Sequence, residues 1–425
     1  MKNEQIIDAM KKGLVIATGC TEPVAIAYAG AVASSHIEDE IEHIKLVASA
    51  NIIKNAFVVG IPGTDLTGLK YAVAIGCMCT EPEKKLAVLE GLTESQIEMA
   101  KQLVEADKVE LAKSDLPYKL YIEVTVKTRA DVVTVTIIGS HTNVTKIVKN
   151  GKTEYNGGCG SSLEEKEEAE YSFDLKDVYE YCLHVDVKEL GLIKTAIELN
   201  SKISEEGLEE QYGLEVGRMI QANVHKKILA DDMTNYAMMI TAAASDARMA
   251  GLSLPVMSNS GSGNQGIAAT LPVVAVWKKL ESNNEEQLLR ACALSNLATI
   301  YIKQKFGILS ALCGAVVAAS GAACGITYLL GGTFQQIENS IHNTLGNVAG
   351  MVCDGAKSSC ALKISTCTNA AMQASLLALR DLRIKSNEGI VEQLSEKTID
   401  NFATLGNEGS ENIDKLILDM IIHKE

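Results

Sequence analysis

One stretch of the sequence strongly limits how the chain can fold: from Phe306 to Ile337 it contains no charged side chain. The stretch is longer than the roughly 20 residues that a helix needs to cross a bilayer. However, it consists of Gly, Ala, Ser and Cys more than of Leu, Ile and Phe, and it lacks an aromatic belt and a flanking basic cluster. We therefore expect a buried helix, or a pair of helices, and no membrane span.

The composition points to a large protein built from close-packed helices. Of the 425 residues, 47% are hydrophobic and only 4% are aromatic, and there are six prolines. A chain of this length is expected to form two domains or three. The scarcity of aromatic residues and proline argues against a β-sandwich or a propeller, which need many strand-rich and turn-rich repeats.

The charge excludes two classes of partner. The net charge is −15, and the lysines form no basic stripe. Because an acidic surface repels phosphate groups, we expect no nucleic acid and no membrane among the partners. The sequence leaves open whether the protein forms a homo-oligomer.

The eleven cysteines indicate a reducing compartment. Eleven is an odd number, and the first residues contain Glu4 and Asp8 where a secretory signal would be apolar. We therefore expect a cytoplasmic protein whose thiols are free, bound to a metal or catalytic, and not paired in disulfides.

The first part of the chain mixes helical and strand patterns. A helix is expected over 3–16 and another from about 21 to 35, with Thr21 as its N-cap and Pro23 in its first turn. Alternating apolar and polar residues, with Gly and Pro as punctuation, predict strands over 43–49, 56–61, 119–127, 132–138 and 144–149. The stretch from Gly157 to Glu170 is expected to be a linker or an exposed helix start.

After about residue 175 the apolar residues follow a helical period of 3.6. The expected helices cover 187–204, 209–228, 232–249, 266–280, 284–301, 308–330, 333–348, 364–383 and 389–403. The predicted fold class is therefore α+β. An α/β domain over residues 1–170, with a small mixed or antiparallel sheet, precedes a mostly helical domain over residues 171–425.

Three cysteines of the helical part are candidate metal ligands: Cys313, Cys353 and Cys360. On one continuous helix Cys353 and Cys360 would be separated by roughly 10.5 Å, which is too far for one small cluster. The residues between them favour a loop, which lets both sulfurs face one point. Thiolates bind iron–sulfur clusters and zinc alike, and the alternative, three cysteines in the core, is a common fate of this residue.

A Gly/Ser-rich loop before an apolar helix is a second candidate site. It contains Ser258, Asn259, Ser260, Gly261, Ser262, Gly263 and Asn264. Such a loop offers backbone N–H groups and hydroxyls to an anion at the helix start. It is neither a Walker A sequence nor a dinucleotide-binding turn, so the carboxylate of a small metabolite fits better than a nucleotide. A plain flexible loop is the alternative.

Two further residues are candidates for proton transfer. Cys20 precedes Thr21-Glu22-Pro23, and a helix start lowers the pKa of a thiol because it favours the thiolate. The tetrapeptide recurs at Cys79, which we expect to lie away from the site. His141, which follows the expected hairpin, is either catalytic or a structural hydrogen bonder.

Together these motifs resemble the L-cysteine desulfidase family, which is related to the α-chain of iron–sulfur L-serine dehydratases. The resemblance covers essentially the whole chain and rests on residues 18–23, 257–266, 313–314 and 353–360. Two departures from the serine enzymes favour the desulfidase. The gap between the last two cluster cysteines is shorter here, and Ser140-His141-Thr142 matches their Ser-Ser-His-Thr stretch only in part.

The resemblance implies a [4Fe–4S] cluster on Cys313, Cys353 and Cys360, with Cys20 as a fourth, displaceable ligand or as the catalytic base. It implies a β-elimination that converts L-cysteine to pyruvate, ammonia and sulfide. An open iron site would bind the leaving sulfur, and a thiolate or the His141 imidazole would take the α-proton. The loop over 258–264 would hold the carboxylate of the amino-acid substrate.

Three alternatives stay open at this point. The same machinery would serve an L-serine or L-threonine dehydratase. The thiols would also suit a non-catalytic protein that only holds a cluster or senses redox state. If the cysteines are merely core residues, the 258–264 loop would make the chain an amino-acid-binding protein.

Overall fold

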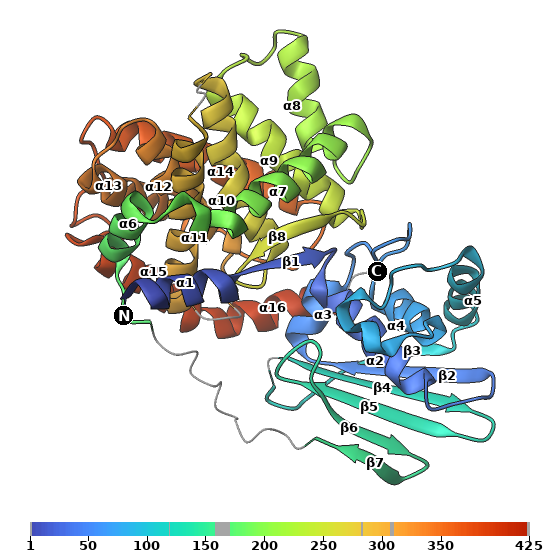
Figure 1. Ribbon diagram of the computed structural model, residues 1–425. Coiled ribbons are helices and arrows are strands. Elements are labelled where there is room, and N and C mark those ends of the chain that lie inside the picture. Colours follow the sequence, from blue (N-terminus) through green and yellow to red (C-terminus); the bar gives the residue numbers. More distant parts are fainter. Residues whose placement is uncertain (1, 119, 158–170, 282–283, 307–309, 423–425) are drawn as a thin grey trace.

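The computed structural model describes residues 2–118, 120–157, 171–281, 284–306 and 310–422. Figure 1 shows a helical part with an α/β part beside it, which confirms the α+β fold class expected from the sequence. The expected linker, apart from Gly157, and residues 307–309 of the uncharged stretch lie outside the described residues.

The α/β part is built on a mixed sheet of six strands in the order β3-β2-β4-β5-β6-β7. β2 and β3 are parallel, and the other neighbouring pairs are antiparallel. The strands are β2 (Ile41–Ala48), β3 (Val109–Lys113), β4 (Tyr121–Thr128), β5 (Val132–Ile138), β6 (Val144–Lys149) and β7 (Lys152–Asn156). The hairpin expected from alternating residues is confirmed as β4-β5, and the strand expected over 144–149 is confirmed as β6.

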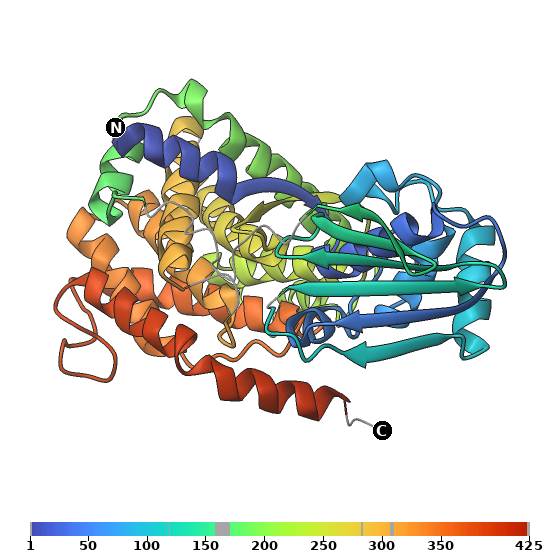
Figure 2. The same ribbon diagram turned by 90° about the horizontal axis from the view of Figure 1, so that it is seen from below.

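Helices cover one face of this sheet, as Figures 1 and 2 show. Helices α2 (Thr21–Ser34) and α4 (Leu69–Met78) contact the strands, α5 (Glu94–Glu105) packs on α4, and α3 (Ala50–Ala56) packs on α2. Every residue of α2 from Pro23 to Ala33 is buried. The start of α2, directly after Cys20, is therefore held rigidly between the sheet and its neighbouring helices.

Two local predictions in this part are wrong. The helix expected over 3–16 is shorter, α1 (Lys2–Gly13), and the chain continues as strand β1 (Leu14–Thr18). The β-branched residues of β1 pair with a strand that is far away in the sequence. The strand expected over 56–61 does not form. Its Gly60 N–H donates to the carbonyl of Met249 instead, and α3 occupies the preceding residues.

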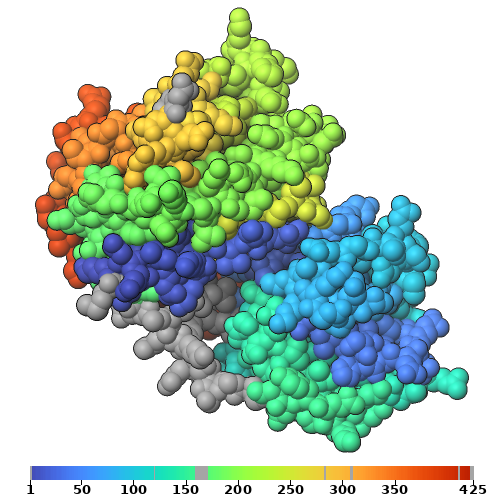
Figure 3. Space-filling view, in the orientation of Figure 1, coloured from blue at the N-terminus to red at the C-terminus, as the bar shows by residue number. Residues whose placement is uncertain are grey.

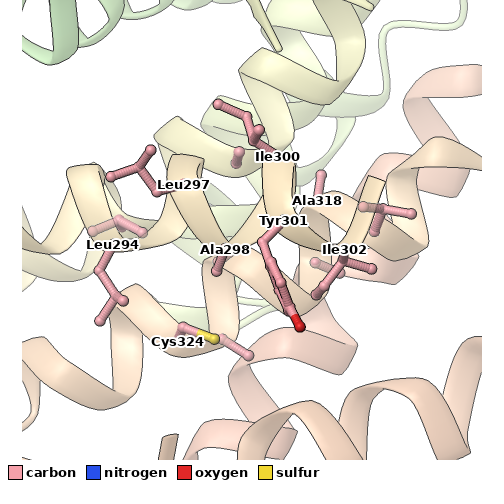
Figure 4. Close-up of a cluster of buried hydrophobic side chains, with 14 of the residues drawn as sticks. Leu294, Leu297, Ala298, Ile300, Tyr301, Ile302, Ala318 and Cys324 are labelled. Carbon is pink, nitrogen blue, oxygen red and sulfur yellow. The ribbon is translucent and has the colours of Figure 1, made fainter. Parts of the chain in front are cut away.

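The helical part surrounds one central helix, α12 (Gly314–Leu329), in which every residue except Gly314 and Tyr328 is buried. Its neighbours are α10 (Gly263–Lys279), α11 (Glu285–Phe306), α13 (Phe334–Val348) and α14 (Cys360–Ala378). Figure 4 shows side chains of α11, such as Leu297 and Ile302, packed with Ala318 and Cys324 of α12. Half of the uncharged stretch thus forms the buried helix α12, and the stretch ends in the first turn of α13. No helix among the described residues combines the length and apolar character of a membrane span.

The remaining helices complete this bundle. They are α6 (Leu175–His184), η2 (Val187–Leu190), α7 (Gly191–Glu209), α8 (Val216–His225), α9 (Met233–Met249) and α15 (Ser395–Asn407). In the α/β part, a short 3-10 helix, η1 (Pro82–Ala87), follows α4.

The first and last segments of the described chain connect the helical part with the α/β part. β1 pairs antiparallel with β8 (Pro255–Asn259), and α1 contacts α11. The last helix, α16 (Ser410–Ile422), packs on α3, and its Leu418 lies in the core of the α/β part. Figure 3 shows the N-terminal segment, in blue, lying along the helical part before the chain enters the α/β part. The division of the chain at residue 170 stays a prediction.

Candidate functional site

A short antiparallel pairing places Cys313 and Cys353 on one face, diagonally opposite each other. Leu312 and Val352 form an isolated β-bridge. The backbone N–H groups of Cys313 and Cys353 donate to carbonyl oxygens of the opposite segment at 2.8 and 2.7 Å. Residues one position away from a bridged pair point to the same side of the two segments. The two thiols therefore share one face.

The loop between Cys353 and Cys360 brings the third thiol to the same place. Cys360 is the first residue of α14, and its Sγ lies 3.7 Å from the carbonyl oxygen of Gly355. Asp354 braces the loop through ion pairs with Lys357, at 2.5 Å, and with Lys363. Although burial acts to raise it, these two lysines hold the pKa of Asp354 at about 2.

The three thiols are close enough to affect one another. Burial raises the pKa of Cys313 to about 12, and Cys353 and Cys360 contribute to the rise. Burial also raises the pKa of Cys360, with a further contribution from Cys353. The structure thus brings together the three cysteines that the sequence analysis selected.

Cys20 lies against this group from the α/β part. It is the N-cap of α2, a place that the sequence analysis gave to Thr21, and it is 3% exposed. It packs with Val59, Met249 and Cys360. The expected lowering of the Cys20 pKa is wrong for the protein as described: burial raises this pKa to about 11, although the Arg248 guanidinium acts to lower it.

The second Cys-Thr-Glu-Pro sequence lies elsewhere. Cys79 is the C-cap of α4, and its Sγ donates to the Ile75 carbonyl at 3.4 Å within the core of the α/β part. The short helix η1 that follows starts from Glu81 and not from the cysteine. Identical tetrapeptides thus lead to different surroundings, because Cys79 closes one helix whereas Cys20 opens another.

His141 lies near the start of α2. It belongs to the connection between β5 and β6, and burial lowers its pKa while the charge of Glu22 acts to raise it. Glu22 follows Cys20 by two residues, and its carboxylate accepts a hydrogen bond from Asn55 Nδ2 at 3.0 Å. The sheet therefore delivers an imidazole to the vicinity of the turn that carries Cys20.

The first residues of the 258–264 loop are bound to the protein itself. Ser258 Oγ donates to the Val15 carbonyl at 2.6 Å, and Asn259 Nδ2 donates to Asn296. Ser260 Oγ donates to Asn259 Oδ1 at 2.9 Å. These side chains hold the end of β8 in place, and their hydrogen-bonding groups are used within the protein.

The second half of the loop leads into the start of α10. Ser262 is the N-cap of α10. Asn264 Oδ1 accepts a hydrogen bond from Arg248 at 3.4 Å. A Cβ on Gly314, next to Cys313, would lie 2.7 Å from Gln265 Oε1, so the starts of α10 and α12 touch. Helix α10 therefore begins beside both Arg248 and the cysteine group, with Gly261 in the turn before it and Gly263 as its first residue.

Comparison with known proteins identifies the family. Residues 83–419 match the sequence profile of the serine dehydratase alpha chain. The chain belongs to the serine dehydratase alpha-chain family. This family is generally associated with iron–sulfur enzymes, and membership supports a dehydratase-like, lyase function. The matched region contains His141, the 258–264 loop and the three grouped cysteines, whereas Cys20 precedes it.

Relatives match this chain over nearly its full length. UPF0597 proteins of Oleidesulfovibrio alaskensis and Porphyromonas gingivalis are each 42% identical to it, over 419 and 431 residues. The alignments cover 99% of this chain and 98% and 99% of the two relatives. A UPF0597 protein of Clostridium perfringens is 41% identical over 424 residues, with 99% of each chain covered.

The donor set fits the iron–sulfur cluster that is associated with this family. Cys20, Cys313 and Cys360 each stand at the start of a helix, where the positive end of the helix dipole opposes the burial that raises the pKa of each thiol. Within the part of the chain that the structure describes, no three Cys, His, Asp or Glu residues lie close enough for a single metal ion. A four-iron cluster does not need its thiolates to meet at one point, because each thiolate binds a different iron.

Sequence analysis missed the basic residues of the site. Arg248 lies against Cys20, and Lys363 acts on the pKa of Cys313 and Cys360. Arg248 belongs to the run Met238 to Ala250, in which Asp246 and Arg248 interrupt small and apolar residues. Charged residues within such a run signal buried charges, and this signal was available in the sequence.

Proposed function

We propose that the chain catalyses a β-elimination on a small L-amino acid, with L-cysteine as the substrate and pyruvate, ammonia and sulfide as the products. One observation carries the proposal: Cys20 of one part faces Cys360, which belongs to a group of three thiols in the other part. The proposal is supported by membership of a family that is associated with iron–sulfur lyases.

In this proposal Cys313, Cys353 and Cys360 hold a [4Fe–4S] cluster, and Cys20 is either its fourth ligand or the base. When bound, such a cluster supplies a Lewis-acidic iron for the leaving sulfur or oxygen. Lys357 and Lys363 offset part of the negative charge that several thiolates bring into a largely buried place.

The protein's own groups manage the α-proton. Burial lowers the pKa of His141, which keeps its imidazole neutral and able to accept a proton near neutral pH. The nearby Glu22 carboxylate would stabilise the imidazolium that forms. If Cys20 serves as a ligand, His141 is the base; if Cys20 takes the proton, His141 has a supporting role.

The start of α10 orients the substrate. Its first N–H groups and Asn264 lie beside Arg248, so a carboxylate placed there is held next to Cys20. The burial of Cys20 and of the end of β8 would limit the access of water to a substrate bound there and strengthen each charged contact.

L-serine is the second candidate substrate. The observation in its favour is the match over residues 83–419 to a family described as serine dehydratase alpha chain. The leaving group would then be hydroxide in place of hydrosulfide, and the same residues would serve.

The test is anaerobic purification of the full chain, with iron and acid-labile sulfide counted before and after exposure to air. L-cysteine and L-serine are then offered separately, and pyruvate and sulfide are measured. The proposal expects equal amounts of pyruvate and sulfide from L-cysteine, and loss of turnover in air. Pyruvate from L-serine alone would establish the second candidate. Bound iron without turnover of either amino acid would refute both.

A further inference from the structure

Arg248 is a buried cation without a carboxylate partner. It is 6% exposed, and none of the ion pairs among the described residues includes it. Its Nη2 donates to the Gly19 carbonyl at 2.7 Å and its Nη1 to Asn264 Oδ1 at 3.4 Å, whereas its Nε is buried without an acceptor. Since a buried charge without a counter-charge costs several kcal/mol, this position favours a bound anion.

Another arginine of the helical part shows the usual solution. Arg290 pairs with the Glu286 carboxylate at 2.8 Å and also donates to the Cys182 carbonyl at 2.7 Å. Arg290 therefore has its counter-charge within the protein. Among the residues that the structure describes, Arg248 contacts the carbonyl oxygen of Gly19, the amide oxygen of Asn264 and the Cys20 thiol, but no carboxylate.

Arg248 lies directly over the start of α10. A Cβ on Gly263 would be 2.3 Å from Arg248 Nε and 2.9 Å from its Nη2, so only glycine lets the guanidinium lie there. Helix α10 has 17 residues, and within the described chain the N–H groups of Gly263 and Asn264 have no acceptor. A guanidinium and free N–H groups at a helix start together form a site for a carboxylate.

We propose that Arg248 binds the α-carboxylate of the amino-acid substrate, together with the first N–H groups of α10. This inference rests on the proposed function and specifies its substrate class: amino acids with a free carboxylate, and not their amides or peptides. Arg248 also donates to the carbonyl of Gly19, the residue before Cys20. A carboxylate bound to Arg248 would therefore lie close to Cys20. Arg248 thus sets the position of the α-carbon relative to the thiol.

The test uses L-alanine, which has the carboxylate and the amine but no leaving group, and L-alaninamide, which lacks the charge. Calorimetric binding to the full chain is measured for the wild type, Arg248→Met and Arg248→Lys, with Arg290→Met as the matched control. The wild type and the control should bind L-alanine in preference to L-alaninamide. Arg248→Met should weaken L-alanine binding about 10- to 100-fold, as expected for a charge-assisted hydrogen-bonded pair, and should leave L-alaninamide binding unchanged. Arg248→Lys should keep part of the preference, because the charge remains while the two-pronged contact is lost.

The outcomes separate this inference from the proposed function. Thermal unfolding establishes that each variant is folded, and Arg248→Lys carries the test if Arg248→Met is not. If the folded variants keep the wild-type preference for L-alanine, or if they lose both ligands equally, the inference is wrong. It is equally wrong if they change only the iron content. An Arg248-dependent preference in a protein that eliminates neither sulfide nor water would uphold the inference and refute the proposed function.

Discussion

Gly355→Ala should disturb the cysteine loop more than its small size suggests. Gly355 stands between Cys353 and Cys360 with φ +96°, in the left-handed region that disfavours a side chain. A Cβ there would lie 2.1 Å from the Lys54 carbonyl oxygen. That carbonyl belongs to a buried residue whose ammonium binds Asp414 at 2.6 Å, so it has little room to yield. The backbone conformation costs about 1–2 kcal/mol and the overpacking about 1–3 kcal/mol, which sum to about 2–5 kcal/mol.

Two measurements check this value. Urea unfolding of the iron-free protein should show a lower midpoint at unchanged slope. Anaerobic reconstitution should yield less iron per chain, because the loop relieves the clash by moving Cys353 and Cys360. Gly350→Ala is the matched control, since a Cβ there meets no atom within 4 Å. If Gly355→Ala unfolds at the wild-type midpoint and binds the same amount of iron, the packing of this loop on α3 is not as described.

Three further outcomes are expected. Cys20→Ser should abolish turnover and keep most of the iron, whereas Cys79→Ser should keep both. Serine variants of the three grouped cysteines (Cys313, Cys353 and Cys360) should lose the iron. Normal turnover by Cys20→Ser would refute this assignment. Burial lowers the pKa of His342 to about 4, below the ordinary 6.5, so the unfolded chain takes up the proton first as the pH falls. About 3 kcal/mol of stability should therefore be lost between pH 6.5 and 4, and His342→Gln should flatten this part of the stability–pH curve; equal curves would contradict it. Lys54→Met should cost about 2–3 kcal/mol and speed proteolysis of α16, because Asp414 keeps a partly buried charge without its partner; an unchanged cleavage rate would show that the ion pair does not hold this helix.

Patterns that depend on neighbouring residues predicted the fold well. The alternation in β4 and β5 reflects a sheet with one buried face, and the uncharged stretch corresponds to the central helix α12. The three cysteines of the helical part were found because residues such as Asp354 and Gly355 break a helix between two of them. Each of these features depends on residues of a single segment, so local sequence patterns were sufficient to predict it.

Features that depend on distant segments escaped the sequence analysis. Leu14 to Thr18 continue the apolar pattern of α1, and only the partner strand β8 makes them a strand. The pKa of Cys20 was predicted from its helix start alone, but burial among Val59 and Met249 outweighs that effect. Arg248 and Cys20 lie close together in the fold but far apart in the sequence. The only local sign of this contact is a charged residue among small residues.

The pairing of β1 with β8 has a consequence for synthesis of the chain on the ribosome. Pro255 follows Thr18 by 237 positions in the sequence, so at about 5–20 residues per second β1 waits on the order of 10–50 s for its partner. During this time Leu14, Val15 and Ile16 present an apolar extended edge that can pair with other nascent chains. Chains released before Pro255 should aggregate more than the same fragments without residues 1–18. Equal aggregation of the two fragments would show that this strand is not the exposed element.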